Sequence, residues 1–104
     1  MITPGAKVGG LRPEMVLAFA IAQPIFERYG ALCTITSALD GKHSRGSLHY
    51  KGLALDLRSR NLMETDKGNV LGELKRDLGF EYDVLLEDSG GPNEHFHIEF
   101  DPKT

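Results

Sequence analysis

The sequence predicts an α+β domain in which helices cover one face of a mostly antiparallel sheet. Two segments carry apolar residues at helical spacing, and two others alternate strictly between apolar and polar or very small residues. Each alternating segment has one apolar face for the helices to cover and one polar face. The chain has 104 residues, which is the length of one domain. We therefore assign residues 1–104 to a single domain, with the glycine-rich residues 1–10 as a flexible lead-in.

The two predicted helices are defined by their apolar stripes and their ends. The first begins near Leu11, has Pro13 in its first turn and ends at Gly30. Pro24 lies within its pattern and should kink or interrupt it. The second helix covers residues 65–78 and ends at Gly79. The stripes consist of Met15, Phe19, Ala22, Phe26 and Tyr29 in the first helix, and Val70, Leu71, Leu74 and Leu78 in the second.

Four strands are predicted at residues 31–37, 51–58, 80–87 and 94–100. A polar loop at residues 40–48 precedes the second strand, and a turn at residues 88–93 precedes the fourth. In the second strand, Gly52, Ala54 and Asp56 share the polar face. In the fourth strand, His95, His97 and Glu99 share it. This half-exposed face therefore leaves room for a ligand.

Composition excludes several classes of protein. Twelve basic residues stand against 15 acidic ones, for a formal net charge of −3, which is not the charge of a general nucleic-acid binder. No apolar run is long enough to span a membrane. A single cysteine, Cys33, excludes an internal disulfide framework. The first ten residues lack a signal-peptide pattern, so we expect synthesis in the cytoplasm. We also expect a monomer that binds neither nucleic acid nor membrane.

All four histidines lie in or beside two short segments, 43–56 and 94–97. Imidazole and carboxylate groups that converge in this way suit zinc, and a catalytic zinc needs three protein ligands and one open position. His49, Asp56 and His97 could supply the three ligands, with Glu94 as general base. Lys42 and Arg45 could face the carbonyl oxygen that becomes negative. Taken alone, any one of these histidines could equally well be a structural residue as a metal ligand.

Two motifs resemble those of a known family. Residues 47–56, SLHYKGLALD, fit S-x-H-x-x-G-x-A-x-D, and residues 94–97, EHFH, fit both E-x-x-H and H-x-H. In this order they resemble the zinc peptidases that include D-Ala-D-Ala dipeptidases and carboxypeptidases and the L-alanyl-D-glutamate endopeptidases of bacteriophage endolysins. Hedgehog signalling domains share the fold of this family. The resemblance extends over residues 30–100 and implies a hedgehog/DD-peptidase-like fold.

The resemblance implies a role for each matching residue. His49, Asp56 and His97 become the ligands of one zinc ion per chain, and Glu94 becomes the catalytic base. His95 would line the site, behind the ligands or facing the substrate, rather than bind the metal. Ser47 would contact the substrate or brace the loop. Many relatives carry an arginine near the end of the preceding strand that polarises the scissile carbonyl, and residues 37–42, SALDGK, have none. We expect Arg45 to replace it, because a guanidinium makes bidentate contacts, with Lys42 also contacting substrate.

The leading interpretation is a zinc metallopeptidase that cuts peptidoglycan stem peptides at the bacterial cell wall, as a phage lysis or virion enzyme does. It would be an L-Ala-D-Glu endopeptidase or a D-Ala-D-Ala carboxypeptidase. The alternative is a non-catalytic, zinc-stabilised binding module of the hedgehog type, which would not need Glu94. A metal-dependent nuclease is a third interpretation, which the acidic net charge disfavours.

Overall fold

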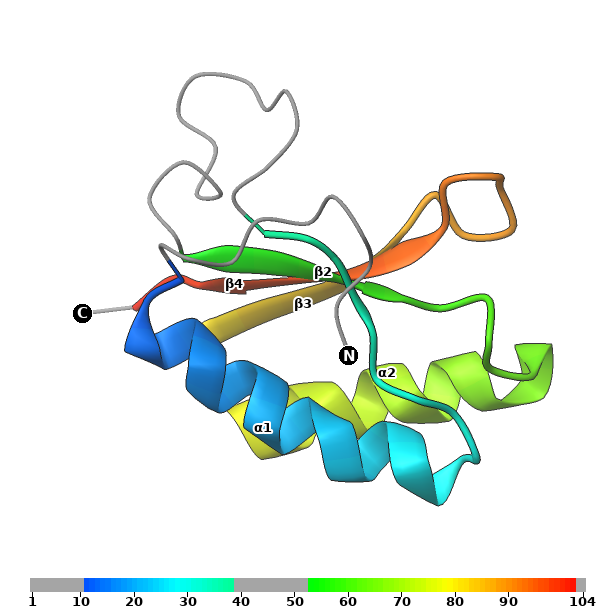
Figure 1. Ribbon diagram of the computed structural model, residues 1–104, viewed down its shortest axis with the longest axis horizontal. Coiled ribbons are helices and arrows are strands. Elements are labelled where there is room, and N and C mark those ends of the chain that lie inside the picture. The colour runs from blue at the N-terminus through cyan, green and yellow to red at the C-terminus, as the bar shows by residue number, and fades with distance from the viewer. Residues whose placement is uncertain (1–10, 39–52, 103–104) are drawn as a thin grey trace.

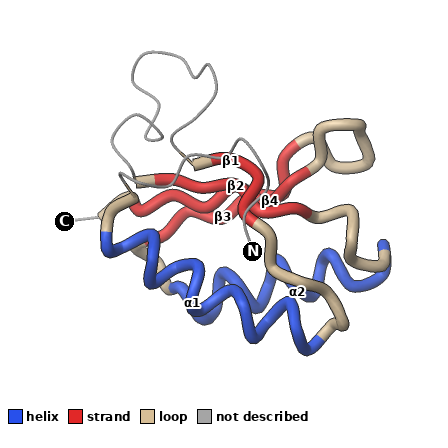
Figure 2. The backbone as a smooth tube through the Cα atoms, in the orientation of Figure 1, coloured by secondary structure: helices blue, strands red, loops and turns tan. Residues whose placement is uncertain are grey.

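The computed structural model describes residues 11–38 and 53–102, which form two helices and a four-stranded antiparallel sheet. The strand order is β1-β2-β4-β3 (Figure 2). Every neighbouring pair is antiparallel. The predicted α+β class with an antiparallel sheet is thus confirmed. In chain order the elements are α1 (Pro13–Arg28), β1 (Ile35–Ser37), β2 (Ala54–Arg58), α2 (Glu64–Leu78), β3 (Tyr82–Glu87) and β4 (His95–Phe100).

Both helices lie on the same side of the sheet (Figure 1). Helix α2 starts one residue before its predicted start and ends at the predicted residue, Leu78. Helix α1 begins with Pro13, where a missing backbone N–H costs nothing. It continues through Pro24 to Arg28, so an interruption at Pro24 was the wrong expectation. Pro24 is exposed, so its ring displaces no core side chain, although the helix lacks the backbone hydrogen bond of that residue.

The strands are shorter than their patterns. β1 covers only residues 35–37 of the predicted 31–37, and its pairing with β2 is irregular between Ile35 and Ser37. β3 and β4 begin at Tyr82 and His95, slightly later than expected. For the second strand, the expected residues 51 and 52 lie outside the described part of the chain. The length of each strand depends on how many of its residues pair with a neighbouring strand, and an alternating pattern does not specify that number.

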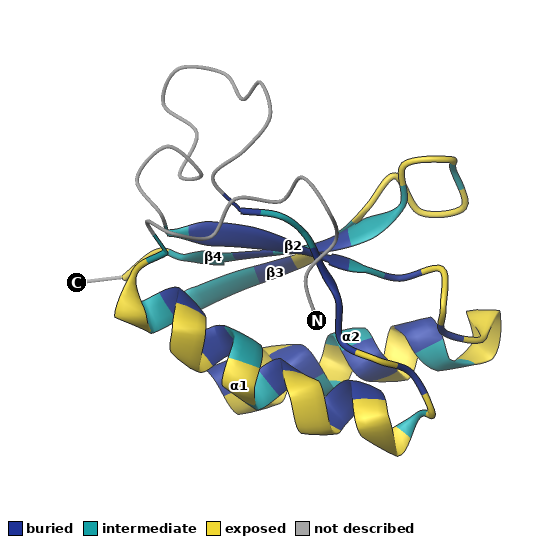
Figure 3. Ribbon diagram, viewed as in Figure 1, coloured by how far each residue is buried: buried dark blue, intermediate teal, exposed yellow. Residues whose placement is uncertain are grey.

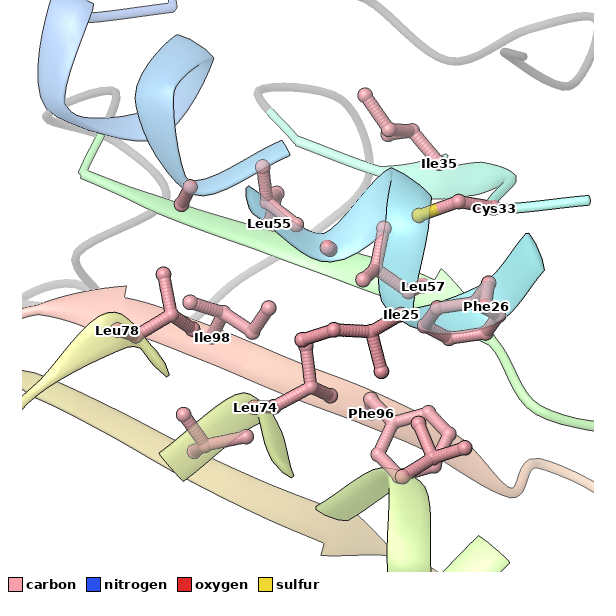
Figure 4. Close-up of a cluster of buried hydrophobic side chains, with 14 of the residues drawn as sticks. Ile25, Phe26, Cys33, Ile35, Leu55, Leu57, Leu74, Leu78, Phe96 and Ile98 are labelled. Atoms are coloured by element: carbon pink, nitrogen blue, oxygen red, sulfur yellow. The ribbon is translucent and has the colours of Figure 1, made fainter. Parts of the chain in front are cut away.

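The core lies between the sheet and the two helices (Figure 4). The rings of Phe26 in α1 and Phe96 in β4 meet edge to face, with centroids 5.7 Å apart. Leu55, Leu57 and Ile98 fill the same layer from β2 and β4 and are fully buried. The outer faces of both helices are exposed (Figure 3). The sheet therefore uses one face for the core, and the other face carries Asp56 and His97.

No helix in the described residues is long and apolar enough to cross a membrane.

Candidate metal centre

Asp56 and His97 lie directly opposite each other on the neighbouring strands β2 and β4. Their flanking residues Leu57 and Phe96 point into the core. Alternation along both strands therefore places Asp56 and His97 together on the other face. His97 Nδ1 lies 2.8 Å from Asp56 Oδ1. The antiparallel register thus joins two of the predicted zinc ligands.

A second carboxylate orients the His97 ring. His97 Nε2 donates to Glu99 Oε1 at 2.8 Å, two residues along the same strand. Burial disfavours the charged ring, but the hydrogen bonds with Asp56 and Glu99 outweigh burial and raise the pKa of His97 to about 9. Without a metal the ring is therefore an imidazolium that donates from both nitrogens. A carboxylate on the far nitrogen is the usual support of a metal-binding histidine.

His95 is held in a similar way on the same face. Its Nδ1 donates to the backbone carbonyl of Asn93 at 2.6 Å. Its Nε2 lies 2.9 Å from Glu87 Oε1 and 3.7 Å from Asp56 Oδ2. Burial again disfavours the charged ring. The Asn93 carbonyl and the Asp56 carboxylate nevertheless give His95 a pKa above its ordinary value. The two carboxylate oxygens of Asp56 therefore face two different histidines.

Glu94 is a buried carboxylate with three hydrogen-bond donors. Ser59 Oγ and Lys67 Nζ each donate to Oε1 at 2.6 Å, and the backbone N–H of Gly90 donates to Oε2 at 2.9 Å. The hydrogen bond from Lys67, followed by those from Ser59 and Gly90, lowers the pKa of Glu94 to about 2. Glu94 is therefore ionised at neutral pH, the state that can accept a proton.

A groove in the described part of the chain is lined by some of these groups. It has a volume of about 390 Å³ and opens beside the start of β4 and the end of β2. It brings together Asp56, Glu94 and His95, three of the residues that the sequence predicts for the site. The full lining is Thr36, Asp56, Arg58, Arg60, Pro92, Asn93, Glu94 and His95.

Four predicted site residues lie outside the described part of the chain. They are the third proposed zinc ligand, His49, together with Lys42, Arg45 and Ser47. The described residues thus contain Asp56 and His97 of the ligand set, and Glu94 and His95 line the groove with Asp56.

Within residues 11–38 and 53–102, sequence reasoning missed four groups that contact the predicted residues. Glu99 had a usable signal, since it shares the polar face of its strand with His97. Glu87 also had one, because it ends a predicted strand close to the turn that leads to His95. Lys67 and Ser59 had none: a lysine three residues after Glu64 on a helix looks like an exposed charge pair. Tertiary packing buries Lys67, whose ammonium group contacts Glu94 in the turn before β4.

Comparison with known proteins adds no relative: no protein-family model, curated protein or solved structure matches this chain.

The described donors suit a zinc ion. Zinc prefers imidazole nitrogen and carboxylate oxygen in tetrahedral sites, and Asp56 and His97 supply one of each at adjacent positions. Glu99 fixes His97 Nε2 as a donor, so Nδ1 is the nitrogen left to bind an ion. The described residues therefore fit the zinc ion that the motifs imply.

Proposed function

We propose that this protein is a zinc-dependent metallopeptidase that hydrolyses peptide bonds in peptidoglycan stem peptides at the bacterial cell wall. The observation that carries the proposal is the Asp56–His97 pair, in which Glu99 orients His97 and Asp56 lines a groove together with Glu94. The two sequence motifs supply the substrate class and a hedgehog/DD-peptidase-like arrangement. His49, Asp56 and His97 would hold the ion.

The chain's own groups would divide the work at the reacting bond. A bound zinc supplies Lewis acidity, which lowers the pKa of water toward about 7 and polarises a carbonyl group. Glu94 accepts a proton from the attacking water and returns it to the leaving amine. Among the described residues, its Oε1 has two donors, whereas Oε2 has only the Gly90 N–H. Oε2 is therefore the oxygen with a lone pair available for that proton.

The groove also suits the substrate. Arg58 and Arg60 line it beside Asp56 and Glu94, and a guanidinium binds carboxylates in a bidentate manner. Stem peptides carry free carboxylates near both candidate bonds, L-Ala-D-Glu and D-Ala-D-Ala. Arg45 and Lys42 remain the groups proposed to stabilise the oxygen that becomes negative.

A second candidate function is a zinc-stabilised binding module that cuts no bond. The observation that favours it is the packing of Glu94. A general base works best with a pKa near the working pH, and the ion pair with Lys67 makes Glu94 a much weaker base. In this alternative Glu94 is a structural partner of Lys67 and Ser59.

One digestion experiment separates the two functions. Purified sacculi are incubated with the zinc-loaded protein, and mass spectrometry of the soluble fragments identifies any new peptide termini. We expect new termini that disappear with a chelator and fall by about 10²–10⁴-fold in Glu94→Gln, which keeps the shape but cannot act as the base. Glu27→Gln, an exposed change on α1, is the matched control.

Sacculi left uncut by the zinc-loaded wild-type protein would refute the peptidase. Binding to sacculi without cleavage would then favour the binding module. Cleavage by Glu94→Gln at the wild-type rate would refute the assigned base.

A further inference from the structure

A second group of potential metal ligands lies beside the Asp56–His97 pair and does not include His97. Asp56, Glu87 and His95 each offer one ligand atom, and these atoms all lie within 4.8 Å of one another. The residues come from three neighbouring strands, β2, β3 and β4, and Glu87 is the register partner of His95. The Asp56 atom nearest His95 is Oδ2, whereas Oδ1 contacts His97. Asp56 therefore belongs to both groups through different oxygens.

The contacts of the His95 ring direct its Nε2 atom toward the two carboxylates. Nδ1 lies 2.6 Å from the Asn93 carbonyl, an obligate acceptor, so Nδ1 carries a hydrogen. Nε2 is then the ring atom that faces the two carboxylates, 2.9 Å from Glu87 and 3.7 Å from Asp56. An imidazole nitrogen and two carboxylate oxygens this close together are donor types that a divalent ion such as zinc binds.

The spacing of the three ligand atoms suits such an ion. Bonds of about 2.1 Å in a tetrahedral zinc site place neighbouring ligand atoms about 3.4 Å apart. The distances from His95 Nε2 to Glu87 and Asp56 are 2.9 and 3.7 Å, one on either side of that value. The Asn93 carbonyl would orient the ring, as the backbone often does for a metal-binding histidine. Because the Glu87 side chain is 44% exposed, the site can be reached from solvent.

We propose that Asp56, Glu87 and His95 form a second divalent-cation site, of zinc-binding chemistry, with Asp56 bridging it to the His97 site. Arg58 and Arg60 line the adjoining groove, and their charges oppose a cation. The second site therefore binds more weakly than the first. The proposal rests on this cluster's own geometry and shares only Asp56 with the proposed peptidase.

Zinc titration of the full chain tests the proposal without measuring activity. Equilibrium dialysis against increasing Zn²⁺, followed by elemental analysis, gives the number of ions bound and the affinity of each step. We expect two ions per chain in the wild type. Glu87→Gln and His95→Asn should each weaken only the weaker step, by at least about tenfold. His97→Asn should remove the tighter step, and Glu27→Gln, an exposed change on α1, should preserve both.

Two results would overturn the second site: a single ion per chain at saturating Zn²⁺, or a second step unchanged in both Glu87→Gln and His95→Asn. Circular dichroism of each metal-free variant checks that the comparison is between folded proteins. The outcome is separable from that of the proposed function. Two bound ions in a protein that leaves sacculi intact would keep the second site and refute the peptidase. One bound ion in a protein that cuts sacculi would refute the second site and keep the peptidase.

Discussion

Lys67 Nζ lies 2.6 Å from Glu94 Oε1, and both side chains are more than nine-tenths buried. Glu64 shares the same ammonium group at 2.6 Å from one helical turn earlier. The contact joins α2 to the turn before β4, the orange loop at the end of the β3–β4 hairpin in Figure 1. It therefore fixes Glu94 beside the groove, whether Glu94 acts as a base or only as a structural partner.

Replacing Lys67 with methionine should destabilise the fold. Glu94 would keep Ser59 and the Gly90 N–H but lose its only positively charged hydrogen-bond partner among the contacts described above. A buried group that loses a partner costs about 1–3 kcal/mol. Urea unfolding of Lys67→Met should show a loss of that size. The control is Lys75→Met, an exposed change on the same helix, which should stay within about 0.5 kcal/mol of wild type. Equal unfolding midpoints for the two variants would contradict a stabilising role for the pair.

The stability of the helix pair should depend on pH through Glu73. Hydrogen bonds from Tyr29 and then Arg28, both at the end of α1, lower the pKa of Glu73 on α2 below its ordinary value. The unfolded chain therefore binds this proton at higher pH than the folded protein does. The stabilisation is present above the unfolded pKa of about 4.5 and is lost as pH falls through the folded value.

Urea midpoints measured from pH 6 to pH 3 test this dependence. The wild type should lose stability more steeply than Glu73→Gln as the pH falls. Glu27→Gln, an exposed change on α1, is the control and should follow the wild-type slope. A Glu73→Gln slope equal to that of the wild type would show that Glu73 is not responsible.

Zinc should raise the melting temperature through the Asp56–His97 pair. A ligand that binds only the folded state stabilises it by about 2.7 kcal/mol at 100 times its dissociation constant. For a domain of this size that corresponds to a shift of about 10–20 °C. Calorimetry with and without zinc should show such a shift in wild type and a much smaller one in His97→Ala. A shift of the same size in both proteins would place the stabilising ion elsewhere.

The thiol of Cys33 should be unreactive in the folded protein. The side chain is buried before β1, and burial raises its pKa to about 12. Since the thiolate is the nucleophile, alkylation by iodoacetamide at pH 8 should be slow in native buffer and fast in urea. Mass spectrometry of timed samples measures both rates. Rapid labelling without denaturant would contradict the burial.

Local sequence patterns predicted the elements and their faces well. The stripe over residues 65–78 predicted α2 to within one residue, and alternation in residues 94–100 assigned His97 and Glu99 to one face. These patterns depend on neighbours a few positions apart, which the chain itself fixes. The same locality explains the errors at Pro24 and at residues 31–34. The solvent-exposed position of Pro24 decided the first outcome, and the pairing of β1 with β2 decided the second.

The sequence by itself determined that Asp56 and His97 stand on polar strand faces and that Glu94 precedes His97 by three residues. Only the tertiary structure decided that Asp56 is the register partner of His97, that its second oxygen faces His95, and that Lys67 is buried against Glu94. The reason is physical. Alternation fixes the face of each side chain, but the alignment of β2 with β4 and the packing of α2 against the turn depend on contacts between residues far apart in the chain.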